Sequence, residues 1–229
     1  MPQTVLFDID GTLLVTGGAG AVAWQRAFRE LHGIDADIEE HTHAGMTDPE
    51  IAEIVFREVI GRDGSEAERA AAIAAYLGHL EDAVNGSSGY RVMPGIEQLL
   101  PRLLEQGVLL GIVTGNIEAA AQIKLARAGL NRFFVFGGYG SDSRDRTELT
   151  KRALERGGTV AGSPVDRATA IAVGDTPRDV KAGHGAGIRV VGVATGSYSV
   201  AELGESGADW AIETVESGFP APAGDGVNS

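Results

Sequence analysis

Apolar residues recur along the chain with two different periods, and the change of period separates two kinds of segment. Residues 4–14 combine an apolar, β-branched run with an Asp-Gly step, which predicts a buried strand followed by a turn. Between about 15 and 90 the apolar positions follow helical spacing, and no strand is predicted. Residues 85–89, Asn-Gly-Ser-Ser-Gly, are typical of a hinge or linker. The helices predicted in this part cover 21–31, 47–60 and 66–83.

From about residue 90 onward, short apolar runs alternate with amphipathic segments. The predicted helices are 94–106, 117–128, 147–156 and 177–186, and the predicted strands are 108–113, 133–136, 168–173 and 189–193. Near-continuous apolar strands that alternate with helices indicate a parallel sheet covered on both faces. We therefore expect an α/β fold, a doubly wound parallel sheet with an inserted all-helical domain. The expected boundaries are 1–15 and 90–217 for the core, 16–89 for the insertion and 218–229 for a disordered tail.

Composition narrows the kinds of site and partner that we expect. The chain has 229 residues, no cysteine and a net charge of −13, with only three lysines. Without cysteine there is no disulfide, thiolate metal site or thiol nucleophile, so any metal must be held by oxygen or imidazole. The negative charge argues against nucleic acid and anionic membranes as partners, and no apolar run is long enough for a membrane span. We expect a cytoplasmic protein; the sequence leaves the oligomeric state open.

Two carboxylates, Asp8 and Asp10, follow the first predicted strand directly. Residues i and i+2 of a strand point to the same side, so both acids should project together from the carboxyl end of that strand. There they could share a cation or divide the work of a nucleophile and an acid. Taken alone, the pattern fits an ordinary acidic turn equally well.

Two further strands also end in polar residues. One is followed by Thr114, Gly115 and Asn116, the other by a turn that carries Asp175 and Asp179. In a doubly wound sheet these ends meet in one crevice. A hydroxyl and exposed amides can hold a phosphate, and carboxylates suit Mg²⁺. The structural alternatives are that Thr114 is a helix N-cap and that Asp179 only caps its helix.

These motifs together resemble the haloacid dehalogenase superfamily of phosphohydrolases, in particular its phosphoglycolate-phosphatase-like members with a helical cap after the first strand. The segment Asp-Ile-Asp-Gly-Thr-Leu at 8–13 is similar to the first motif of the family, Thr114 to the second and Gly-Asp-Thr-Pro-Arg-Asp at 174–179 to the fourth. The resemblance implies a Mg²⁺-dependent phosphatase that acts on a small phosphorylated metabolite, with 2-phosphoglycolate as a family-level candidate.

The resemblance also implies roles for single residues. Asp8 would attack phosphorus and form an aspartyl-phosphate, and Asp10 would act as general acid and base. Asp8, Asp175 and the carbonyl of Asp10 would bind Mg²⁺, and Asp179 would order the waters of the metal. Thr114 and the amides near it, at Gly115 and Asn116, would hold the phosphoryl oxygens.

The third motif of the family is where this sequence departs from the pattern. The family has a lysine ahead of a helix, whereas the segment 141–151 offers Arg146 at the expected helix start and Lys151 five residues later. Five residues correspond to roughly 140° around a helix, so both cannot face one site. Arg146 is the preferred phosphate clamp, Lys151 is the alternative, and either could instead be a solvated surface cation.

Other functions fit part of the pattern. A phosphomutase of the same superfamily would use the same acids, and a signalling receiver phosphorylated on aspartate, or a catalytically silent binding module, would also cluster them. We expect specificity to depend on residues 16–18 and on the loop 41–48, where His41 and His43 are interpreted as polar loop residues. Trp24 and Trp210 are interpreted as packing residues.

Overall fold

The computed structural model describes residues 3–35 and 37–220. The disordered tail expected for 218–229 falls mainly on 221–229, which lie outside the described residues; Gly218 ends the last helix. Within the described ranges, no helix is both long enough and apolar enough to cross a membrane.

A six-stranded parallel sheet forms the centre of the larger part of the molecule. Side by side, its strands are β5 (Gly137–Gly138), β4 (Leu109–Val113), β1 (Thr4–Phe7), β6 (Ile171–Gly174), β7 (Arg189–Val193) and β8 (Trp210–Ile212). Val5 and Phe7 of β1 pack into one hydrophobic core, and Leu6 packs into another on the opposite face. The first strand therefore lies in the middle of the sheet with both faces buried, which explains its continuous apolar run.

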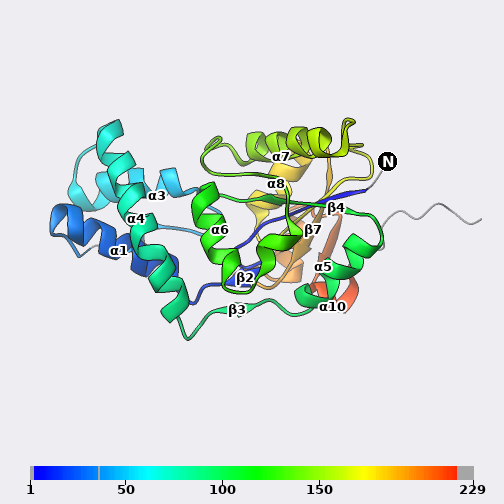
Figure 1. Ribbon diagram of the computed structural model, residues 1–229, viewed down its shortest axis with the longest axis horizontal. Helices are drawn as coiled ribbons and strands as arrows, with labels where there is room; N and C mark the ends of the chain where they lie inside the picture. The colour runs from blue at the N-terminus through cyan, green and yellow to red at the C-terminus, as the bar shows by residue number, and fades with distance from the viewer. Residues whose placement is uncertain (1–2, 36, 221–229) are drawn as a thin grey trace, which may run out of the picture.

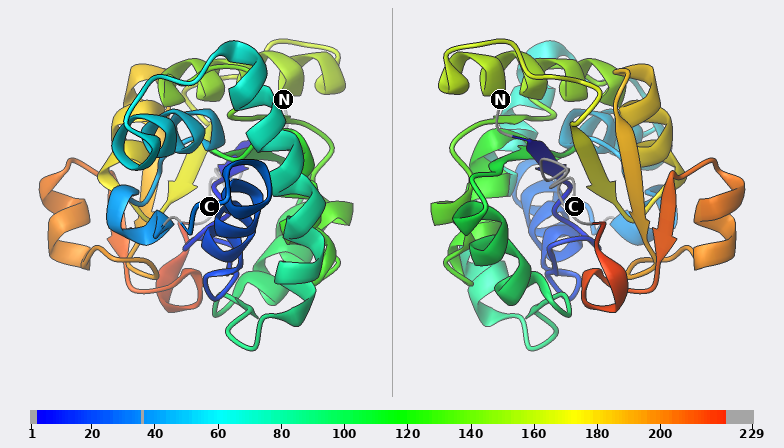
Figure 2. Two further views of the ribbon diagram at one scale, coloured as in Figure 1. Left: turned by 90° about the vertical axis from the view of Figure 1, so that its left-hand side faces the viewer. Right: turned by 90° about the vertical axis from the view of Figure 1, so that its right-hand side faces the viewer.

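Helices cover both faces of this sheet (Figures 1 and 2). Residues of α5 (Ile96–Glu105) and α6 (Glu118–Ala126) contribute to the core that holds Val5 and Phe7. Residues of α7 (Arg146–Ala161) and α8 (Pro177–Gly185) contribute to the core that holds Leu6. The remaining short elements of this part are η2 (Leu130–Phe133), α9 (Val200–Glu205) and α10 (Val215–Gly218). The α/β fold class with a parallel sheet is confirmed.

A group of helices, called the helical unit below, lies at one end of the molecule beside α6 (Figure 1). It consists of α1 (Ala19–His32), α2 (Ile38–His41), α3 (Asp48–Ile54), η1 (Val55–Ile60) and α4 (Glu66–Gly86). Its own core is centred on aromatic side chains, with Trp24 stacked on Tyr76 at a ring distance of 4.3 Å and Phe28 edge-on to Phe56. Ile117 and Ala120, at the start of α6, also pack into this core. The helical unit is thus packed against the sheet through α6.

The two chain segments that connect the helical unit to the sheet pair with each other. Strands β2 (Leu14–Val15) and β3 (Arg91–Val92) form a two-stranded antiparallel ribbon. The sequence predicted no strand here because two residues are too few to show a period.

Most predicted elements are present with shifted ends, but the strand predicted at 133–136 is wrong. Phe133 ends the 3₁₀ helix η2, residues 134–136 follow it without strand structure, and the edge strand β5 comes after them at Gly137 and Gly138. The apolar run at 133–136 reflects burial in the core and not strand structure, since Phe133, Phe134 and Phe136 are all buried. A glycine is needed at 138 because a Cβ there would lie 1.9 Å from the carbonyl oxygen of Leu149 in α7. Tertiary packing at this edge therefore overrides local strand propensity.

This contact yields a prediction of stability. Gly138→Ala should lower the free energy of unfolding by about 2 kcal/mol or more, because backbone must move to admit the methyl group. Gly78→Ala is the matched control: it lies within α4 with no neighbour within 4 Å of the added Cβ, so it should raise stability by about 0.5–1 kcal/mol. Urea denaturation followed by circular dichroism measures both, and equal effects of the two substitutions would contradict the packing argument.

Candidate active site

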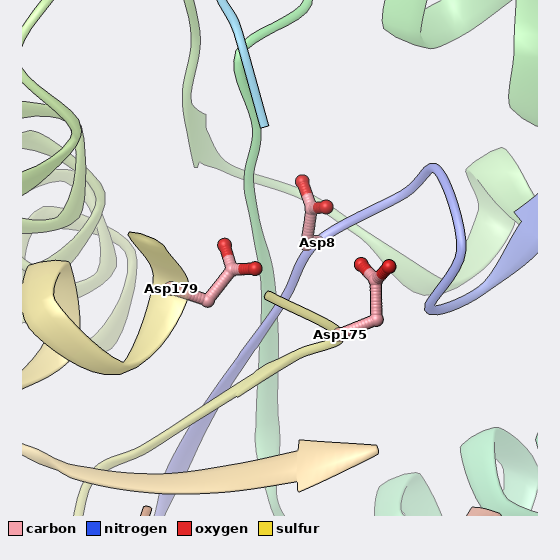
Figure 3. A group of neighbouring side chains, drawn as sticks. All are labelled: Asp8, Asp175 and Asp179. Carbon is pink, nitrogen blue, oxygen red and sulfur yellow. The ribbon is translucent and has the colours of Figure 1, made fainter. Parts of the chain in front are cut away.

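Three buried carboxylates converge at the carboxyl edge of the sheet. Asp8 directly follows β1, where its amide donates to the carbonyl of Val173, and Asp175 directly follows β6. Asp179 lies in the first turn of α8. One oxygen of each lies within 4.8 Å of the others, and the three side chains point toward a common space (Figure 3). The structure thus brings together three of the acids that the sequence proposed.

Glycines hold Asp175 in place from two sides. A Cβ at Gly196 would lie 1.8 Å from Oδ2 of Asp175, and one at Gly11 would lie 2.4 Å from the same oxygen. Gly11 also adopts a φ of +82°, which favours glycine. The Thr12 hydroxyl donates to Oδ1 of Asp175 at 3.2 Å. The turn after β1 therefore both presents Asp8 and leaves room for Asp175.

Asp179 has two functions in the structure. Its Oδ2 accepts from the amide of Thr176 at 3.0 Å and from the hydroxyl at 2.7 Å, so it completes a capping box at the start of α8. The capping interpretation is therefore correct, but it is incomplete. Its Oδ1 accepts from the guanidinium of Arg146, which places Asp179 in the carboxylate cluster as well.

Arg146 is the cation that the structure places against this cluster. It is the first residue of α7, its side chain is 8% exposed, and Nη2 lies 3.4 Å from Oδ1 of Asp8 as well as contacting Asp179. Lys151, one and a half turns further along α7, is partly exposed and pairs with Glu148 at 2.8 Å. The structure thus brings Arg146 to the site and leaves Lys151 on the surface.

Burial and mutual repulsion change the titration of the acids. Burial, followed by the charges of Asp179 and Asp10 against that of Arg146, raises the pKa of Asp8 to about 7. Burial, followed by the charges of Asp179 and Asp8, raises the pKa of Asp175 to about 8. Asp175 contacts no cationic side chain of the described residues. The donor set is all oxygen and carries more negative charge than Arg146 balances, so it fits a hard divalent cation such as Mg²⁺.

Asp10 lies in a separate polar network. It accepts from Nζ of Lys124 at 2.9 Å through Oδ1 and at 2.7 Å through Oδ2, and from Nδ2 of Asn116 at 2.7 Å. Lys124 also donates to Oδ1 of Asn116 at 2.7 Å, which closes the network. The chain leaves strand geometry after Phe7, so Asp8 and Asp10 have different partners although both line one cavity.

Sequence reasoning missed Lys124. It lies in the alanine-rich helix α6, where a lysine ordinarily faces solvent, yet it is 6% exposed. The one signal was its position on the apolar face of that helix, next to Leu125, among only three lysines in the chain.

The Thr114 segment lies between the carboxylates and the helical unit. Thr114 is not the N-cap of α6, which is Ile117, so the capping interpretation of Thr114 is wrong. Its hydroxyl accepts from the amide of Asn116 at 3.3 Å and from Nδ2 of Asn116 at 2.9 Å. The carbonyl of Gly115 accepts from the amide of Asp48 in the helical unit at 2.9 Å. The segment therefore contacts both parts of the molecule.

Asp48 was interpreted from the sequence only as part of a helix start, but it reaches across to the sheet side. Thr47 caps α3, which leaves the Asp48 carboxylate free to accept from the amide of Ile117 at 2.8 Å. Burial raises the pKa of Asp48 to about 6, while Lys124 and the Ile117 amide oppose the shift. A buried acid of the helical unit thus satisfies an amide at the start of α6.

A cavity of about 200 Å³ lies between the helical unit and the sheet edge. Its sheet side includes Asp8, Asp10, Thr114, Lys124 and Arg146, and its other side includes Trp24, His43, Met46, Asp48 and Tyr76. A group bound at Asp8 in this cavity would therefore face residues of both parts.

The sequence of the chain matches the family described as "Haloacid dehalogenase-like hydrolase" over residues 5–193. The chain belongs to this family. It is 30% identical over 236 residues to a phosphoglycolate phosphatase of Rhodospirillum rubrum, covering 98% of this chain and 95% of that protein. It is 29% identical over 208 residues to a validoxylamine A 7'-phosphate phosphatase of Streptomyces hygroscopicus subsp. limoneus, covering 85% of this chain and 87% of that protein.

A solved structure shares the fold. The crystal structure of a predicted phosphoglycolate phosphatase from Haemophilus somnus superposes with a TM-score of 0.72 at 20% identity, covering 93% of this chain and 94% of that one.

The raised pKa values of the acids predict how stability depends on pH. In EDTA the folded protein binds more protons than the unfolded chain between about pH 4 and 8, so its free energy of unfolding should fall by a few kcal/mol as pH rises through that range. Asp175→Asn keeps an acceptor for Thr12 and removes one charge, so it should flatten this fall and exceed the wild type in stability at pH 8. Urea denaturation at several pH values measures the slope.

The exposed Asp82→Asn in α4 is the matched control and should leave the slope unchanged. Mg²⁺ should restore stability to the wild type at pH 8 and much less to Asp175→Asn. If the free energy of unfolding of the metal-free wild type instead rises from pH 5 to 8, the carboxylates do not carry the uncompensated charge inferred here.

Proposed function

We propose that this protein is a Mg²⁺-dependent phosphatase that hydrolyses a small phosphorylated metabolite through an aspartyl-phosphate on Asp8. The chain is a hydrolase of the haloacid dehalogenase-like family, and its relatives are named phosphatases. The observation that carries the proposal is the convergence of Asp8, Asp175 and Asp179 with Arg146, of which Asp8 and Arg146 line the cavity.

Asp8 is the nucleophile in this proposal. One carboxylate oxygen forms a bond to phosphorus while the bond from phosphorus to the alcohol oxygen breaks, and water later displaces the phosphate from Asp8. Arg146 lies against Asp8 and balances charge where the phosphoryl group would be attacked. Asp8, Asp175 and the carbonyl of Asp10 would hold Mg²⁺, with Asp179 beside it, and the metal would supply positive charge between the phosphate and the carboxylates.

Asp10 is the general acid and base. Its carboxyl gives a proton to the leaving alcohol oxygen and then takes one from the hydrolytic water. Lys124 and Asn116 fix the direction of this carboxyl by three hydrogen bonds. Thr114, with the backbone amides of Gly115 and Asn116, holds the phosphoryl oxygens in the proposal, and the cavity position of this segment supports that assignment.

The helical unit acts in this proposal as a cap, residues 16–89, over a core of 1–15 and 90–217. Its loop 41–48 lies over the segment 114–116, where a Cβ at Gly115 would be 2.4 Å from the carbonyl oxygen of Met46. Such close contact supports a role in excluding bulk water from the reaction and in contacting the alcohol part of the substrate. The two relatives act on different phosphate esters by name, so the substrate is argued below from the cavity itself.

The decisive experiment measures hydrolysis of p-nitrophenyl phosphate with Mg²⁺ and with EDTA. We expect turnover with Mg²⁺ alone, and a loss of at least about a thousandfold in Asp8→Asn because the nucleophile is gone. Burst kinetics with trapped aspartyl-phosphate and no further release would instead indicate a phosphorylated signalling domain.

Two variants of α7 test whether Arg146 or Lys151 is the cation that acts at the site. Arg146→Met should lower kcat/KM by about a hundredfold or more, since a buried charge partner of Asp8 is removed. Lys151→Ala is the matched control on the same helix and should stay within about twofold of wild type, because its ion pair is exposed. A larger loss for Lys151→Ala than for Arg146→Met would reverse the assignment.

In this proposal Lys124 acts by positioning Asp10. Comparing substrates with poor and good leaving groups tests this role. Lys124→Met should lower kcat/KM for an alkyl phosphate by about a hundredfold, because an alkoxide leaves poorly without a well-placed acid. For p-nitrophenyl phosphate, whose phenolate leaves readily, the loss should stay under about tenfold. Equal losses on both substrates would show that Lys124 serves only to support the fold.

A further inference from the structure

Two aromatic side chains of the helical unit that carry a hydrogen-bond donor line the cavity. Trp24 of α1 and Tyr76 of α4 are each 1% exposed, stack with an interplanar angle of 8° and line the cavity that contains Asp8. Nε1 of Trp24 is buried and makes no hydrogen bond of ordinary geometry, although it lies near enough to the Asp48 carboxylate to oppose the rise in the pKa of that group. Among the described residues, the Tyr76 hydroxyl has no hydrogen-bond partner. A buried N–H or O–H without a partner carries a free-energy cost that a ligand can relieve. Trp24 is therefore more than the packing residue expected from the sequence.

Asp48 lies beside these two groups. It is 3% exposed, and its Oδ2 accepts from the Ile117 amide, which fixes the direction of the carboxylate. Tyr76, Asp48 and Asp10 line the same cavity. Burial, followed by the charges of Asp48 and Asp10, raises the pKa of Tyr76 well above its ordinary value. Two donors and one acceptor are thus held on the cap side of the cavity by helices and by an amide of the core.

The charges of the cavity indicate which ligand these groups accept. Lys124 is the nearest cation, but its three donors are already used by Asp10 and Asn116. Arg146 is paired with Asp8 and Asp179 on the sheet side, and His43 lies in the exposed part of the loop. Among the described residues that line this cavity, no unpaired Lys or Arg stands next to Trp24 and Tyr76. A carboxylate there would therefore face Asp48 without compensation.

We propose that Trp24, Tyr76 and Asp48 form a leaving-group subsite that selects phosphate esters of neutral, hydroxylated alcohols over esters that carry a carboxylate. A hydroxyl group can accept from the Trp24 N–H or the Tyr76 O–H and donate to Asp48, whereas a carboxylate can only accept. The proposal rests on the proposed function and names its substrate class: a polyol or sugar phosphate. It sets this chain apart from a relative named for phosphoglycolate.

A pair of nearly isosteric substrates tests the subsite. In 2-hydroxyethyl phosphate a CH₂OH group replaces the carboxylate of 2-phosphoglycolate, and glycerol 3-phosphate and 3-phosphoglycerate form a second pair. We expect the wild type to show a kcat/KM at least about tenfold higher for the hydroxylated member of each pair. Equal or higher values for the carboxylated members would overturn the proposal.

Three conservative variants test which residues cause the preference for hydroxylated substrates. Asp48→Asn keeps an acceptor for the Ile117 amide and removes the charge, so it should shift the ratio of kcat/KM values toward the carboxylated substrates by about tenfold. Trp24→Phe and Tyr76→Phe keep the stacked rings and remove one donor each, so each should raise KM for the hydroxylated substrates. Trp210→Phe, in β8 and outside the cavity lining, is the control and should leave both ratios unchanged.

Binding separates this inference from the proposed function. In Asp8→Asn with Mg²⁺, titration calorimetry should show tighter binding of 2-hydroxyethyl phosphate than of 2-phosphoglycolate, and Asp48→Asn in the same background should narrow the difference. If p-nitrophenyl phosphate is hydrolysed but the preference is absent in both assays, the subsite is wrong and the phosphatase stands. If no phosphate ester is hydrolysed or bound, both are wrong.

Discussion

The main physical constraint on this structure is the negative charge that the fold concentrates at one edge of its sheet. Three buried carboxylates share a space less than 5 Å across, and a single arginine contacts two of them. Left in a low-dielectric interior, such charges oppose folding unless a cation joins them or some of them take up protons. The raised pKa values of Asp8 and Asp175 express this opposition, and the capping box of α8 and the glycines around Asp175 hold the acids in place against it.

The same edge is where the helical unit meets the sheet. Asp48 joins the two parts through hydrogen bonds to the backbone at Gly115 and Ile117, and Gly115 has no room for a side chain. Because these bonds involve residues next to Thr114 and Asn116, the position of the helical unit and the geometry of the proposed phosphate-binding segment are linked. The Asp10, Asn116 and Lys124 network continues this link to the proposed acid.

The sequence was sufficient for the parts of the site that lie next to strand ends. Asp8, Thr114 and Asp175 each follow an apolar run directly, so local pattern and the geometry of parallel sheets locate them together. Lys124 and Asp48 could not be found in this way because their partners are 114 and 69 residues away along the chain, and each looks locally like an ordinary helix residue. The edge strand β5 was missed for a similar reason, since its two glycines are determined by the approach of α7 and not by strand propensity.

The paired connections β2 and β3 have a mechanical consequence. Both covalent links between the two parts run through one ladder two residues long, so they cannot slide independently of each other. A swing of the helical unit would bend at this ladder, outside the strands that carry Asp8 and Asp175, and the carboxylate geometry would survive it. Asp8, the proposed nucleophile, would then stay preorganised throughout each cycle of substrate entry and product escape.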